Sequence, residues 1–290
     1  MASTPGRIGK RVKREINGLK RVLRRKTRCP FANREQRPII LHGSHHKVGT
    51  SWMQKVLRSV STEYGLKYQD CDQADLDPET DVFFQDHSRF DLNRFDHYRG
   101  SHMVRDPRDV MVSGYYYHLW TKEEWANLPM SSFGPEVHRA WAHVPFDEAG
   151  DLTYKDFLNS LDREAGLAME IRRAATTEMR DFTEWDYQNP AFYELKYEAM
   201  IKDEAAVFEQ LFRHYGFTDQ AVARCVELAE ACSFRKQAKR DLGRVDNKSH
   251  MRSGLPGQWR DELSEAHKVL FKELNGDALV RMGYEQDIDW

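Results

Sequence analysis

The sequence is poor in cysteine and has no long apolar run. Its 290 residues include four cysteines, too few for a disulfide framework in so long a chain and without the spacing of a metal site. No uncharged stretch exceeds about a dozen residues, whereas a membrane-spanning helix needs about 20 apolar ones. The basic start leads into no apolar segment of the kind found in secretory signals. We therefore expect a reducing, cytoplasmic setting.

Charge is distributed unevenly along the chain. The formal net charge is −2. Residues 1–28 contain eleven basic residues and one acid, Glu15, and carry +10, which leaves −12 for residues 29–290. This asymmetry is typical of a basic interaction tail on a mildly acidic body.

Residues 1–36 are expected to form that tail. Between Ile8 and Leu23, apolar residues recur every three to four positions among Lys and Arg, which predicts a basic amphipathic helix. One interpretation is contact of residues 7–28 with a membrane surface, peripheral to it. The other is a solvated or partly disordered helix that lies on the domain. The apolar stripe has no Trp or Phe to favour the membrane.

Residues 37–290 read as one domain in which strands alternate with helices. We expect strands at 38–42, 82–84, 102–104 and 192–197, and helices at 50–64, from Pro107, and at 204–215, 220–232 and 262–274. Residues 119–190 form a variable stretch that becomes helical around 154–185. The short, nearly continuous apolar strands predict an α/β fold with a central parallel sheet flanked by helices.

The segment HGSHHKVGTSW joins the first strand to its helix. Gly43 and Gly49 allow backbone N–H groups to turn toward an anion, and Thr50 begins a helix whose dipole favours negative charge. Lys47 adds a cation. The lysine precedes the glycine, unlike in a Walker A motif, so a nucleoside triphosphate with Mg²⁺ is not the natural ligand. The plainer interpretation is a glycine turn with a surface lysine.

Two further segments carry possible anion-binding residues. Arg105 ends a strand, and Ser113 follows two helical turns later, so both are placed to contact a phosphate. Alternatively, Arg105 and Asp106 form an ion pair that caps the helix. The segment MRSGLPGQW, with Arg252, suits a flap that closes over an anion, or is a plain loop between helices.

The motifs together resemble the PAPS-dependent sulfotransferase family, of the Sulfotransfer_1 type with the P-loop-like cytosolic fold. The resemblance spans about 38–284 and rests on five motifs in order: HKVGTSW, RDPRDVMVS, LKYE, CSF and RSGLPGQW. It implies that the protein moves a sulfuryl group from PAPS (3′-phosphoadenosine 5′-phosphosulfate) to an acceptor hydroxyl or amine and releases PAP. No metal is required, because Lys and Arg neutralise the phosphates.

The resemblance assigns a role to each matching residue. Lys47 is the catalytic lysine, and Trp52 stacks on adenine. The 5′-phosphosulfate loop is formed by Val48, Gly49, Thr50 and Ser51. Arg105 and Ser113 bind the 3′-phosphate. The other cofactor contacts fall on Tyr197, Ser233, Phe234, Arg252, Ser253 and Gly254.

Three positions depart from the family pattern. His46 replaces the usual proline, Val48 the usual serine, and Ser253 the usual basic residue. Val48 loses a hydroxyl contact, although its backbone amide would still serve. Ser253 removes a charge near the 3′-phosphate, so cofactor affinity is expected to be weaker.

The family also uses a histidine as general base after a strand. His87 in FFQDHS fits this position, since a neutral imidazole accepts a proton near pH 7. Asp86 is the fallback. Position favours His87 over the other candidates, which are His45, His46, His97 and His102.

The acceptor is left open by the sequence. Trp120, Trp125, Trp141 and Trp185 would either line an apolar acceptor pocket or belong to core and lid. Small-molecule, lipid and glycan acceptors all fit, no nucleic acid is expected, and the oligomeric state is not indicated. Two other functions compete: a P-loop small-molecule kinase, and a non-catalytic module that binds anionic surfaces.

Overall fold

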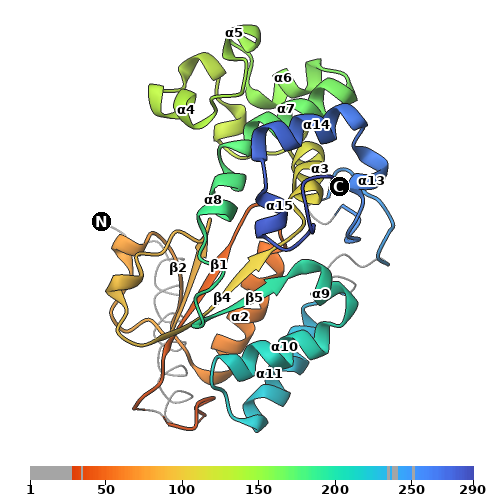
Figure 1. The fold of residues 1–290 in the computed structure, drawn as a ribbon. Coiled ribbons are helices and arrows are strands. Elements are labelled where there is room, and N and C mark those ends of the chain that lie inside the picture. Colours follow the sequence, from red (N-terminus) through yellow and green to blue (C-terminus); the bar gives the residue numbers. More distant parts are fainter. Residues whose placement is uncertain (1–27, 34, 234–235, 237–240, 250–251) are drawn as a thin grey trace, which may run out of the picture.

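The structure is a computed structural model that describes residues 28–33, 35–233, 236, 241–249 and 252–290 (Figure 1). Most of the expected basic tail, residues 1–36, lies outside the described residues, and so does Phe234. Among the described residues, no helix has the length and apolar character needed to cross a membrane.

A parallel sheet of five strands forms the centre of the molecule, in the order β2-β3-β1-β4-β5 (Figure 1). Its strands are β1 (Ile39–Ser44), β2 (Tyr68–Asp70), β3 (Val82–Asp86), β4 (Tyr98–Val104) and β5 (Phe192–Lys196). The predicted α/β fold is confirmed. Because β1 lies between β3 and β4, the loops that follow these three strands meet at one edge, where ligands bind in open α/β sheets.

The strands differ from the sequence prediction where their residues are not apolar. Strand β2 is short and half-exposed, and it was not predicted. Strand β4 begins at Tyr98, four residues before the predicted start at 102. The prediction missed its first residues, Tyr-Arg-Gly-Ser, because they do not form an apolar run. Gly100 permits the pairing with β5, since a Cβ atom there would lie 2.3 Å from the ring of Phe192.

The helices predicted from apolar periodicity are present. They are α2 (Thr50–Tyr64), α3 (Pro107–His118), α10 (Glu204–His214), α11 (Asp219–Ala231) and α14 (Glu265–Asn275). Asp106 caps α3 through the backbone N–H of Arg108, as the sequence indicated. Helix α2 buries Met53, Val56 and Leu57 and contacts α11.

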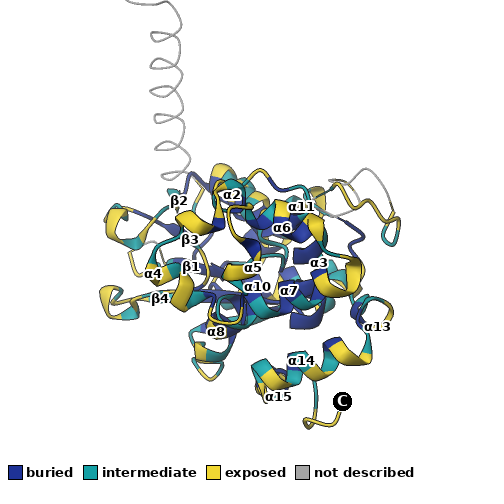
Figure 2. Cartoon of the chain, turned by 90° about the horizontal axis from the view of Figure 1, so that it is seen from above, coloured by how far each residue is buried: buried dark blue, intermediate teal, exposed yellow. Residues whose placement is uncertain are grey.

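The segment between residues 119 and 190 folds into short helices beyond the carboxyl ends of the strands (Figure 1). They are η3 (Trp125–Asn127), η4 (Met130–Ser132), α4 (Pro135–Ala140), α5 (Phe146–Ala149), α6 (Tyr154–Ser160), α7 (Arg163–Ala175) and α8 (Glu178–Glu184). Figure 2 shows buried residues gathered on α3 and α7, with exposed ones on α4 and α14. Three tryptophans of this segment pack in or against the core: Trp125 and Trp141 contact each other, and Trp185 stacks on His102.

The remaining elements are short. They are η1 (Gln73–Asp75), η2 (Leu92–Arg94), α9 (Tyr197–Lys202), α13 (Trp259–Glu262) and α15 (Ala278–Arg281). Arg108 holds α13 and the C-terminal segment to α3, since its guanidinium lies 3.7 Å from the ring centroid of Trp259 and 4.4 Å from that of Trp290.

Candidate functional site

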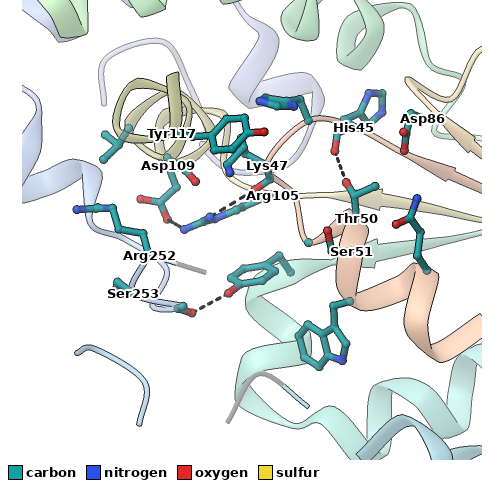
Figure 3. A pocket seen from close by; sticks show the side chains of 18 of the residues that line it. His45, Lys47, Thr50, Ser51, Asp86, Arg105, Asp109, Tyr117, Arg252 and Ser253 are labelled. Carbon is teal, nitrogen blue, oxygen red and sulfur yellow. Dashed lines mark hydrogen bonds and ion pairs between the residues drawn. The ribbon is translucent and has the colours of Figure 1, made fainter. Parts of the chain in front are cut away.

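A cavity of about 670 Å³ opens where β1, β3 and β4 end (Figure 3). Most of the predicted site residues line it: Lys47, Gly49, Thr50, Ser51, Trp52, His87, Arg105, Ser113, Tyr197, Arg252, Ser253 and Gly254, together with Asp86. Val48 and Ser233 do not line it. The side chain of Val48 is fully buried in the core.

The loop between β1 and α2 has a strained backbone. Lys47 has φ 62° and Gly49 has φ 112°, both in the left-handed region. No side chain caps α2, and its first turn contains no acid. The Thr50 hydroxyl donates to the carbonyl of His45 at 2.6 Å, which fixes the loop. The amides of Trp52 and Met53 donate to the carbonyl of Gly49, whereas those of Thr50 and Ser51, at the start of α2, remain available to an anion.

Lys47 is held beneath an aromatic ring. Its Nζ lies 3.9 Å from the ring centroid of Tyr117, whose hydroxyl donates to Glu123 at 2.6 Å. Burial, and next the nearby Arg105, lower the pKa of Lys47 to about 7, although Glu123 and Glu170 act in the opposite direction. A bound anion would restore the charged form. Sequence reasoning assigned Tyr117 no role, although it lies in α3 four residues after Ser113.

Arg105 lies at the end of β4 and is nearly buried. Its Nη2 donates to the carbonyl of Leu255 at 3.3 Å and lies 3.6 Å from Asp109. Its Nε is buried and has no hydrogen-bond partner among the described residues. The suggested pair of Arg105 with Asp106 is not formed, because Asp106 pairs with Arg108 instead. Arg105 thus keeps a buried donor, which fits an anionic ligand.

The segment around Arg252 is tied to α3. Asp109 accepts hydrogen bonds from the backbone N–H groups of Gly257 at 2.6 Å and Trp259 at 3.0 Å. The Tyr197 hydroxyl donates to the carbonyl of Gly254 at 2.8 Å. Arg252 itself pairs with Glu262 at 3.2 Å. Sequence reasoning missed Asp109, which lies in the first turn of α3, four residues after Arg105.

Trp52 and Tyr197 form an aromatic wall of the cavity. Their ring centroids are 6.4 Å apart at an interplanar angle of 84°. The indole Nε1 of Trp52 is buried without a hydrogen-bond partner in the described part of the chain. Ser113 lies on the same cavity, two turns along α3 from Arg105.

His87 lies directly after β3 with φ 72°. Its Nδ1 is 3.3 Å from the carboxylate of Asp181 in α8. Arg89 donates two hydrogen bonds to the same carboxylate. The hydrogen bond with Asp181 is the main reason that the pKa of His87 is raised, in opposition to burial. With Nδ1–H engaged, Nε2 is the basic atom. Asp181 carries no sequence signal, since it is far from His87 in the chain.

The other histidines considered as the general base differ in whether they line the cavity. His45 and His46 line the cavity, whereas His97 and His102 do not. Within the described residues, no group of three or more His, Cys, Asp or Glu is arranged to hold a metal ion.

Comparison with known proteins identifies a family. A model of the sulfotransferase domain matches residues 101–283. Mouse sulfotransferase SULT7A1 complexed with PAP is a similar solved structure, with 16% identity, a TM-score of 0.48, and 83% of this chain and 84% of that chain covered. Retinol dehydratase in complex with androsterone and the inactive cofactor PAP has 16% identity and a TM-score of 0.43, with 84% and 81% covered. No curated protein matches the sequence.

Replacing Asp109 with Asn should loosen the segment from Gly254 to Trp259. An amide has one acceptor oxygen, so one of the two backbone N–H groups loses its partner, at a cost of about 1–3 kcal/mol. Hydrogen exchange at Gly257 and Trp259 should become faster, and the protein should unfold at lower urea concentration. Asp261→Asn, at an exposed acid of the same segment, is the control. Unchanged exchange in Asp109→Asn would contradict the assigned anchor.

Proposed function

The chain belongs to the sulfotransferase family, and from that premise we propose that it transfers a sulfuryl group from PAPS to a hydroxyl or amine of an acceptor and releases PAP. The observation that carries the proposal is the convergence of Lys47, the N terminus of α2, Arg105 and His87 on one cavity. Cations and helix amides are the groups that bind phosphate and sulfate, and a histidine base lies beside them.

The cavity residues fit the three parts of this donor. Lys47 and the amides of residues 48–51 would bind the 5′-phosphosulfate at the start of α2. Arg105 would bind the 3′-phosphate with its buried Nε, joined by Ser113 and by the segment of Arg252, Ser253 and Gly254. Trp52 and Tyr197 would contact adenine. Ser233 and Phe234 are proposed near the base on the family pattern alone.

We propose the catalytic roles on the basis of the same geometry. The donor supplies an activated sulfuryl group when bound. His87 accepts the proton of the acceptor hydroxyl at Nε2, because Asp181 holds Nδ1. Lys47 would neutralise the charge on the oxygen from which the sulfuryl group departs, and the loop amides would stabilise the negative charge of the transferred group. As in phosphoryl transfer, most of the catalysis is positioning and electrostatics.

A kinase is the less favoured function. Its phosphate loop would end in Gly-Lys-Ser or Gly-Lys-Thr, whereas here Lys47 precedes Gly49. A thermal-shift comparison of PAP with ATP plus Mg²⁺ separates the two, since a ligand that binds the folded state raises its melting temperature. Stabilisation by ATP with Mg²⁺ and not by PAP would favour the kinase.

The proposed setting is cytoplasmic, with a small-molecule, lipid or glycan acceptor. The basic residues 7–28 have no role in the proposed sulfuryl transfer. Their contact with a membrane is a hypothesis from the sequence alone.

Lys47→Ala tests the proposal. Without the ammonium group, transfer of labelled sulfate from PAPS should fall by a factor of about 100 or more. PAP should still bind within about tenfold of wild type, because Arg105 and the loop amides remain. Lys202→Ala, at an exposed lysine of α9, is the matched control. Near-wild-type turnover in Lys47→Ala would overturn the assignment.

The pH dependence of kcat/KM for PAPS should be bell-shaped with a narrow maximum near neutrality. His87 must be neutral, and its pKa is raised above 6.5, so the rate falls as the pH drops through that pKa. Lys47 must be protonated, and its pKa is about 7 in the free protein, so the rate falls as the pH rises above it. Lys47→Arg should move the alkaline limb upward. A flat alkaline side in wild type would contradict the role of Lys47.

Asp181→Asn should lower the pKa of His87, because the carboxylate that raises it is removed. The acid limb of kcat should move to lower pH. At the optimum, kcat should fall about tenfold or more, with little change in the KM for PAPS, because His87 loses its fixed tautomer. Glu184→Gln, at an exposed acid at the end of α8, serves as control. An unshifted acid limb would show that Asp181 is merely structural.

A further inference from the structure

We propose that the acceptor carries an ammonium group near the hydroxyl that is sulfated, and that Asp86, with Glu123 and His45, binds this ammonium. The chemical class is an amino alcohol, an amino sugar or a phenolic amine. The inference rests on the proposed sulfuryl transfer, since it concerns the part of the same cavity that lies beside Lys47 and His87.

Asp86 is a carboxylate without an ion-pair partner among the described residues, and it lines the cavity beside His87. It is the last residue of β3, pairs in register with Ser44 of β1 and directly precedes His87. Its side chain lines the cavity (Figure 3) and makes no hydrogen bond or ion pair with the described residues. The part of Asp86 that is buried, and next Asp70, raise its pKa, whereas the neighbouring His87 lowers it and Glu123 raises it again. A cation placed there would relieve the cost of this unpaired charge.

Glu123 provides a second carboxylate on the cavity wall. It accepts hydrogen bonds from the Tyr117 hydroxyl and from Trp125 Nε1, each at 2.6 Å. Burial alone would raise the pKa of Glu123, but these two bonds and the neighbouring His118 and Lys47 lower it. Glu123 is therefore ionised and fixed in orientation, so it contributes negative charge without moving.

His45 contributes a buried acceptor atom. His102 Nδ1 is 2.8 Å from Glu194, so this nitrogen donates, and burial lowers the pKa of His102 and leaves its Nε2 unprotonated. His45 Nε2 is 2.8 Å from that atom and must donate to it. The ring of His45 is fully buried and neutral, so its Nδ1 carries a lone pair. That Nδ1 has no partner among the described residues, and His45 lines the cavity.

This side of the cavity is thus rich in hydrogen-bond acceptors and in negative charge. Of the cations on the same cavity, Arg58 pairs with Asp70 at 3.1 Å, Lys47 lies over the Tyr117 ring, and Lys55 is an exposed residue of α2. An ammonium group offers three donors and a positive charge, which match Asp86 and His45. An apolar phenol or steroid would leave these groups desolvated and unpaired. The net charge of −12 on residues 29–290 also attracts cations.

Matched acceptor pairs test the inference. Labelled sulfate transfer from PAPS is measured with tyramine against 4-ethylphenol and with glucosamine against glucose, and binding of each probe to the PAP-loaded protein is measured by calorimetry. We expect the ammonium member of at least one pair to have a kcat/KM, and an affinity, about tenfold higher. Equal use of both members, preference for the neutral ones, or no binding of either ammonium probe overturns the inference.

Asp86→Asn separates this role from others. The preference for the ammonium member should fall about tenfold, mainly through KM. Asp75→Asn removes the same charge at an exposed acid outside the cavity and should leave the preference intact. An equal loss of kcat for both members would make Asp86 a general base and overturn the inference. If PAP does not stabilise the wild-type protein, the proposed function fails instead, so the two failures are distinguishable.

Discussion

The burial of the Lys47 ammonium is the constraint on which the site depends. A cation removed from water beside Arg105 is costly, and the pKa of Lys47 falls to about 7 as a result. The Tyr117 ring, itself held by Glu123, offsets part of that cost. The remaining cost of burying the Lys47 ammonium would be offset by an anion bound in the cavity. The same arrangement that makes the empty cavity unfavourable for the Lys47 ammonium therefore favours a bound anion, which we propose is the phosphosulfate group.

Backbone strain marks the same residues. Within the described part of the chain, the non-glycine residues with positive φ are Lys47, His87 and Ser88. Such conformations persist where the surrounding structure fixes them, and they gather at functional sites. Here the Thr50 hydroxyl fixes the first loop, and Asp181 with Arg89 fixes the second. The strain places both side chains on one cavity from two adjacent strands.

The sequence predicted those features that have a local signature. Apolar runs and periodicity indicated β1, α2 and α3, and glycine and cation spacing indicated the loop of Lys47. Strand β2 has no apolar run, so it was missed. Tyr117 and Asp181 reach the site only through packing of α3 and α8 over the strands, and no local pattern encodes that. For the tryptophans, the sequence left two alternatives open, a place in the core or in an acceptor pocket, because composition alone does not distinguish the two.

Binding of an anionic donor should restore the charge of Lys47. Calorimetric titration with PAP near pH 8, in buffers of different ionisation enthalpy, measures the protons taken up on binding. Because Lys47 is largely neutral at that pH in the free protein, we expect net uptake approaching one proton, and its loss in Lys47→Met. Binding of PAP without proton uptake, or with the same uptake in Lys47→Met, would contradict the account.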